Sequence, residues 1–143
     1  MATIKSNVAE LQTGVGLGKL LPTSLGGRVR YIHGVITPSS AAAAGTVLEL
    51  ARLPKGARLL PCSQLHFEAG QNASLTVKVG DSADDDRYFA AAAPGASATS
   101  IDLAANALGE YIFDKEDAVI VTTGAQALTS GKKIGFDLYY VID

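Results

Sequence analysis

The stretch VGDSADDDRY, residues 79–88, places four aspartates within six positions. Carboxylates this close together are typical of calcium ligands and of the acid and base pairs of hydrolases. A calcium loop of the EF-hand type requires glycine at its sixth position and glutamate at its twelfth. Counted from Asp81, these positions hold Asp86 and Ala92, so the sequence does not match an EF-hand.

A less regular calcium site built from Asp81, Asp84 and Asp86 stays open, because hard cations accept irregular sets of oxygen ligands. The interpretation we favour is a polar β-turn, in which Gly80 and the aspartates supply turn geometry and bond to the backbone. Arg87 would then neutralise part of the acidic charge. We therefore predict no metal site at this stretch.

Nucleophilic catalysis needs a base beside a serine or cysteine, and the chain has only two histidines, His33 and His66, each in a predicted strand. The sequence contains no G-x-S-x-G motif, and Cys62 follows a proline without a motif around it. Two isolated histidines also fall short of the three or four ligands that zinc requires. We therefore predict that the protein is not an enzyme and uses neither a metal nor a cofactor.

At 143 residues the chain is long enough for one domain with a single core. Cys62 is its only cysteine, so the fold must be stable without an internal disulfide. The N-terminal residues do not resemble a signal peptide, and no apolar run approaches the roughly 20 residues that span a bilayer. We expect a soluble protein of the cytoplasm without a membrane partner.

The net charge of −2 hides an uneven distribution. Residues 1–60 carry seven Lys or Arg against two Glu, a balance of +5, whereas residues 61–143 carry five against twelve acidic residues, a balance of −7. This asymmetry would favour docking between copies, although the charges could equally interleave once the chain folds. Because the basic residues are scattered and lack interleaved aromatics, we expect no nucleic-acid partner.

Residues 1–27 differ in pattern from the rest of the chain. The segment LQTGVGLGKLLPTSLGG, residues 11–27, separates its leucines by glycines, and Pro22 prevents a long helix. Its GVGLGKL stretch lacks the spacing of a phosphate-binding loop. We therefore predict an extended N-terminal arm over residues 1–27, followed by a separate β domain over residues 28–143.

From residue 28 onward the pattern has a period of two, which predicts strands. The predicted strands cover residues 28–37, 46–53, 57–61, 64–70, 74–81, 87–92, 110–113, 117–123 and 132–143. Residues 100–108 are the one candidate for a turn or two of helix, and the alanine-rich patches 39–45 and 90–100 fit loops or packed strand edges. Because nothing provides βαβ crossovers, we predict an all-β protein, an antiparallel jelly-roll β-sandwich of about eight strands.

Residues 49–95, ELARLPKGARLLPCSQLHFEAGQNASLTVKVGDSADDDRYFAAAAPG, resemble the decoration or cement proteins that sit on the HK97-type capsids of tailed bacteriophages. The resemblance is carried by the RLPKGAR segment and by the alternating strand that runs into VGD, an acidic turn and RY. The aromatic C-terminal strand IGFDLYYVID adds to it. Together these features cover most of residues 28–143.

The resemblance implies a structural virion protein on the capsid surface, assembled in the host cytoplasm, that bridges neighbouring capsomers of the phage major capsid protein. It also implies a homodimer or homotrimer. The arm would reach across the capsid protein or a sister subunit. From the composition of the arm we infer these contact residues: Leu17, Lys19, Leu20, Leu21, Arg28 and Arg30.

Two other functions are compatible with a jelly roll. The first is a carbohydrate- or receptor-binding module of a virion, although the chain has no tryptophan to stack on a sugar. The second is a metal enzyme of the cupin type, which would need several histidines and a carboxylate on adjacent strands. The histidine spacing disfavours the cupin alternative.

Overall fold

The computed structural model describes residues 28–38, 43–103 and 111–142. These residues form strands, turns and loops without a helix, and accordingly contain no helix long and apolar enough to cross a membrane. The strands are β1 (Arg28–Ile36), β2 (Val47–Leu53), β3 (Arg58–Leu59), β4 (Gln64–Phe67), β5 (Thr76–Gly80), β6 (Phe89–Ala92), β7 (Thr99–Asp102), β8 (Asp117–Gly124) and β9 (Ile134–Ile142). The predicted all-β class is confirmed.

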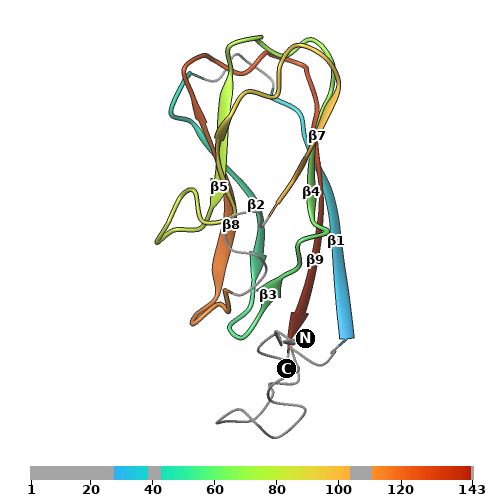
Figure 1. Ribbon diagram of the computed structural model, residues 1–143, viewed down its shortest axis with the longest axis vertical. Helices are drawn as coiled ribbons and strands as arrows, with labels where there is room; N and C mark the ends of the chain where they lie inside the picture. The colour runs from blue at the N-terminus through green and yellow to red at the C-terminus, as the bar shows by residue number, and fades with distance from the viewer. Residues whose placement is uncertain (1–27, 39–42, 104–110, 143) are drawn as a thin grey trace, which may run out of the picture.

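The strands form two antiparallel sheets that face one another (Figure 1). The first, here called the β1 sheet, has the order β1-β9-β4-β7, with the short β3 also paired to β9. The second, the β2 sheet, has the order β2-β8-β5-β6. Two layers of this kind make a β-sandwich, whose core lies between the sheets.

Strand pairing is nested along the chain. β1 pairs with β9, β2 with β8, β4 with β7 and β5 with β6, so the chain folds like one long hairpin rolled into two layers. Without the two-residue β3, this is the eight-stranded double-sheet arrangement of a jelly roll. The innermost turn of the roll, between β5 and β6, is the acidic stretch at residues 81–88.

The core is built from the inward sides of both sheets, as period-two alternation requires. The predicted period of two is confirmed in β5, where Val77 and Val79 are buried, and in β9, where Ile134, Phe136 and Leu138 are buried. The largest fully buried side chains are Tyr88, Phe113, Leu53, Leu59, Leu65, Leu75, Leu103, Leu128, Ile134, Leu138, Val77 and Val79.

Two of the strand assignments differ from prediction. Residues 99–102, which overlap the start of the candidate helical turn at 100–108, form β7, because Ile101 and Leu103 face the core while Ser100 and Asp102 are exposed. Residues 104–108 lie outside the described part of the chain. The predicted strand at residues 110–113 contributes only a single bridge within its described part, between Ile112 and Arg58. Of the two alanine-rich patches, residues 39–42 and the side chain of residue 91 lie outside what the structure describes.

Gly34 in β1 leaves space for the aromatic ring of Phe136, which belongs to the core. Its strand partner is Phe136 in β9, and a Cβ added at Gly34 would overlap the Phe136 ring. Gly135, which is the partner of Val35, is different, because a Cβ there would make only ordinary contacts at 3.8–4.0 Å. The glycine at position 34 is therefore required by packing.

Candidate interaction surface

The acidic turn is organised around one buried carboxylate. Asp81 is 1% exposed, and its Oδ1 accepts hydrogen bonds from the backbone N–H groups of Ala83 at 3.0 Å and Asp84 at 3.1 Å. The Nε of Arg87 donates to Oδ2 of Asp81 at 2.5 Å. Asp81 therefore serves the turn itself, as the favoured interpretation of this stretch predicted.

The turn also packs tightly against the end of β5. A Cβ added at Gly80 would overlap the backbone of Asp84 and Asp85, so only glycine fits there. Asp84, Asp85 and Asp86 can bring one carboxylate oxygen each within 4.8 Å of one another, but Asp85 is already paired with Lys78 at 2.6 Å. The calcium set with Asp81 as a ligand is not brought together.

Contacts from the turn reach the segment before β8. The guanidinium of Arg87 lies 3.7 Å above the ring centroid of Tyr111, a cation–π contact. Ser82 donates a hydrogen bond to Oδ2 of Asp117, and this bond, with the N–H of Ala118, lowers the pKa of Asp117. These contacts join the turn between β5 and β6 to the start of β8 and to the segment before it, so their role is structural.

A second cluster lies on the outer face of the β1 sheet. Asp137 in β9 accepts a hydrogen bond from the Tyr31 hydroxyl at 2.6 Å, and its two oxygens lie 2.8 Å from Nδ1 of His33 and Nε2 of His66. The Tyr31 ring also packs against Tyr139, with centroids 4.9 Å apart. One carboxylate thus joins side chains from β1, β4 and β9.

These hydrogen bonds change the acidity of the groups involved. The bonds from Tyr31, His33 and His66 stabilise the ionised carboxylate and lower the pKa of Asp137 to about 2. The same Asp137 carboxylate raises the pKa of Tyr31 to about 12. Asp137 therefore stays charged and Tyr31 stays protonated over the whole physiological range.

Ser100, His66 and Asp137 are linked in the order of a hydrolase triad, since Nδ1 of His66 lies 2.8 Å from the Ser100 hydroxyl. Strand side chains project perpendicular to a sheet, whereas backbone N–H groups lie in its plane. The N–H groups flanking Ser100 in β7 therefore do not point to where an oxyanion would form beside its hydroxyl. The linkage holds the His66 imidazole between Asp137 and Ser100 on the outer face of the β1 sheet.

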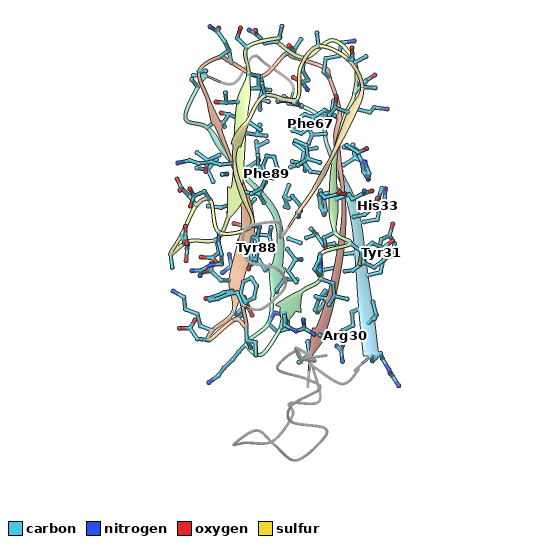
Figure 2. The ribbon with its side chains drawn as sticks, in the orientation of Figure 1. Arg30, Tyr31, His33, Phe67, Tyr88 and Phe89 are labelled. Carbon is cyan, nitrogen blue, oxygen red and sulfur yellow. The ribbon has the colours of Figure 1, made fainter. Side chains whose placement is uncertain are left out.

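The outer face of β1 is unusually apolar for a solvent-facing surface. Val29 is 56% exposed, Tyr31 55% and Val35 52%, and His33 lies between the last two. Figure 2 shows Tyr31 and His33 on the side of β1 away from the other sheet, whereas Phe67 and Tyr88 lie between the sheets. β1 also ends the sheet order, so its second edge has no strand partner among the described residues.

Of the six residues predicted to contact the capsid, two are described. Arg28 and Arg30 are exposed at the start of β1, next to this apolar face. The other four lie outside the described residues: Leu17, Lys19, Leu20 and Leu21. The arm at residues 1–27 therefore stays a prediction.

The Asp137 cluster could not be predicted from the sequence. His33 and Asp137 are 104 positions apart, and they meet only because β1 and β9 are paired in a register that places them opposite each other. The available signal was weak. Each residue lies in a strand with a period of two, but nothing in the sequence indicated that the first and last strands are neighbours.

Comparison with known proteins finds similarity at the level of structure. No protein-family model and no curated protein sequence matches the chain. A chain from the capsid of Ralstonia phage GP4 has a TM-score of 0.69 and 21% identity over 94% of this chain and 96% of its own length. A chain from the capsid asymmetric unit of cyanophage Pam1 has a TM-score of 0.59 and 18% identity over all of both chains. The chain shares their fold.

Proposed function

We propose that the protein is a structural component of a bacteriophage virion, a decoration or cement protein that binds the outside of an HK97-type capsid and bridges neighbouring capsomers. The single observation that carries this proposal is end-to-end similarity to chains from two phage capsids. The similarity covers nearly all of this chain and nearly all of each of the two matched chains.

The distribution of side chains agrees with a binding role. The most obvious chemical cluster in the sequence, the acidic turn, holds the fold together through Asp81 and Arg87. The outer face of β1 instead leaves apolar side chains in solvent, and exposed apolar surface of this kind often marks a contact with another protein. Arg28 and Arg30 add exposed positive charge at the start of β1, directly after the predicted arm.

Many weak contacts suffice for such a role. On a capsid lattice each copy is held near its neighbours, so a modest contact per copy becomes strong collectively. An arm that orders on binding would cover a long seam, at an entropic cost that each copy meets once. We therefore assign the first capsid contacts to Leu17, Lys19, Leu20 and Leu21, together with Arg28 and Arg30.

Co-sedimentation of the full chain with phage shells that lack it tests the proposal. We expect binding by the wild type, and a loss of at least about tenfold in affinity for a Leu17→Asp, Leu20→Asp, Leu21→Asp variant, because buried charge is costly. Arg28→Glu with Arg30→Glu should weaken binding in a salt-dependent manner. Lys55→Glu, an exposed charge in the turn after β2, is the matched control.

The wild-type result tests the function, and the variants test the surface. Absence of wild-type binding to shells would overturn the decoration role. Undiminished binding by the leucine variant would leave the role but remove the arm from it.

One observation favours a second function, a carbohydrate- or receptor-binding module of the virion. Tyr31 is exposed beside Tyr139 and next to the polar groups of Asp137, His33 and His66, and an aromatic ring with hydrogen-bonding neighbours is suited to a sugar. A glycan-array signal that disappears in Tyr31→Ala would support this function over the first.

A further inference from the structure

We propose that two copies of this chain pair, antiparallel and about a two-fold axis at Ile32, through the β1 edge that has no strand partner within the described residues. This inference rests on the geometry of β1 and does not depend on the proposed capsid role. The two β1 sheets would then join into one continuous sheet across the dimer.

Comparison of the sheet edges points to β1. Natural proteins protect edge strands by keeping them short, by bulges or by charge. β6 and β7 have four residues each, and β2 has a register shift between Glu49 and Ala51. β1 has nine residues, each paired to β9 without a register shift. Among the edge strands that end the two sheet orders, β1 is the long and regular one.

The sequence of β1 is self-complementary about its middle residue. Ile32 is the fifth of nine residues, so an antiparallel pair centred there overlaps along the whole strand. Val29 would face Val35 of the second copy, and Tyr31 would face His33 of the second copy. The exposed valines would thus cover one another on the outer face of the sheet, as cross-strand apolar pairs do.

The same register keeps the positive charges apart. Arg30 would face Gly34 of the second copy, which has no side chain to obstruct it, and Arg28 would face Ile36. No arginine lies opposite another. Nine facing residue pairs would exchange about eight to ten backbone hydrogen bonds, because alternate pairs of an antiparallel ladder each share two.

Such an interface closes at two copies. A contact between identical surfaces about a two-fold axis is isologous, so it leaves no free β1 edge for a third copy. This interface therefore gives a dimer and not a trimer, whereas the sequence alone left both open.

Sedimentation equilibrium of the full chain, without capsid protein, tests the assembly. We expect a dimer whose dissociation constant rises at least about tenfold in Val29→Lys with Val35→Lys, because lysines would then face each other across the axis. Val29→Glu with Val35→Glu should do the same. A one-to-one mixture of the two variants should restore dimers, since each lysine then faces a glutamate. Val47→Lys on β2, 55% exposed, is the matched control.

Disulfide trapping tests the register. In a Cys62→Ser background, a mixture of Val29→Cys and Val35→Cys chains should oxidise to a heterodimer, because directly opposed residues have the Cα separation that a disulfide needs. Each variant alone should stay uncrosslinked. Crosslinking of Val29→Cys with itself would overturn the two-fold axis at Ile32.

Three outcomes of sedimentation would overturn the interface itself. These are a monomer at all concentrations up to about 1 mM, a trimer, or a dimer that the lysine variant leaves intact. Because Val29 and Val35 are more than half exposed in the single chain, their substitution should leave the circular dichroism spectrum unchanged, which separates loss of pairing from loss of folding. Shell binding by wild type is a different measurement, so failure here leaves the capsid role standing.

Discussion

Asp81 and Asp137 are both aspartates that accept three or more hydrogen bonds, yet their surroundings are opposite. Asp81 is buried in the turn between β5 and β6, where backbone N–H groups and Arg87 hold it. Asp137 lies on the outer face of the β1 sheet and binds Tyr31, His33 and His66. The first uses neighbours within six positions along the chain, whereas the second gathers partners from strands far apart in sequence.

This contrast distinguishes a carboxylate that stabilises the fold from one that is accessible for binding. A buried carboxylate that loses its partners leaves uncompensated charges and unsatisfied N–H groups, so every contact of Asp81 is needed for stability. The Asp137 cluster is in contact with water, and its loss would be partly compensated by solvent. The aspartates that are close together in the sequence therefore stabilise a turn, whereas the exposed polar cluster is formed by residues that are far apart in the sequence.

The largest effect should come from Asp81. We expect Asp81→Ala to lower the free energy of unfolding by about 3–5 kcal/mol, because it leaves Arg87 without its buried partner. Chemical denaturation measures this value. Asp84→Ala, which removes a partly exposed carboxylate of the same turn, should cost far less, and equal losses for the two variants would remove the distinction between Asp81 and its neighbours.

Alanine substitutions of two glycines test how tightly the acidic turn and the outer face of the β1 sheet are packed. Gly80→Ala should lower stability by about 1–3 kcal/mol, because the added methyl overlaps backbone atoms of the acidic turn that have no room to move. Gly135→Ala, on the outer face of β9, should be neutral, because its methyl makes ordinary contacts with His66. Thermal melting of both variants gives the comparison, and a destabilised Gly135→Ala would mean that the outer face is packed as tightly as the turn.

Acid titration tests the outer cluster. The pKa of Asp137 is lowered to about 2 from an ordinary value of 3.8, so the stability that its ionised form contributes is present above about pH 4 and lost as pH falls toward 2. Asp137→Asn should lack this component, so the stability difference between wild type and variant should shrink across that window. Asp114→Asn, an exposed carboxylate, controls for the loss of one charge. A difference independent of pH would contradict the prediction.

Calcium should have the smallest effect. We expect no measurable shift in melting temperature on adding calcium, because Asp81 is engaged by Arg87 and Asp85 by Lys78. A shift that disappears in a variant with Asp84→Ala and Asp86→Ala would instead make the acidic turn a cation site.

The sequence was informative where local rules decide the structure. Alternation predicted the strands that became β1, β2, β5 and β9, because a strand with one buried face has a period of two. The acidic turn was equally predictable, since glycine and aspartate favour turns for local reasons. β7 was ambiguous because it has only four residues, too few for alternation to be distinguished from one helical turn.

The candidate surface depended on information that local patterns do not carry. Alternation separated the two faces of β1 but did not say which one is buried, and the valines of the outer face look as apolar as the core. The outcome is fixed by Ile32 and Ile36, which pack against the core, and by Gly34, which admits the Phe136 ring. Likewise, the meeting of Asp137 with both histidines is set by strand order, which is a property of the whole chain.

The pairing of Arg28 with Ile142 has a practical consequence for anyone who wishes to attach cargo to this protein. It brings Ile142, the last described residue, beside the first residue of β1, so a peptide fused after Ile142 would emerge at the end of the sandwich where β1 begins. The loop between β6 and β7, whose residues 96–98 are exposed, lies toward the opposite end of the sandwich in Figure 1. An insertion there would lie far from Arg28 and Ile142, which makes this loop the better place for display.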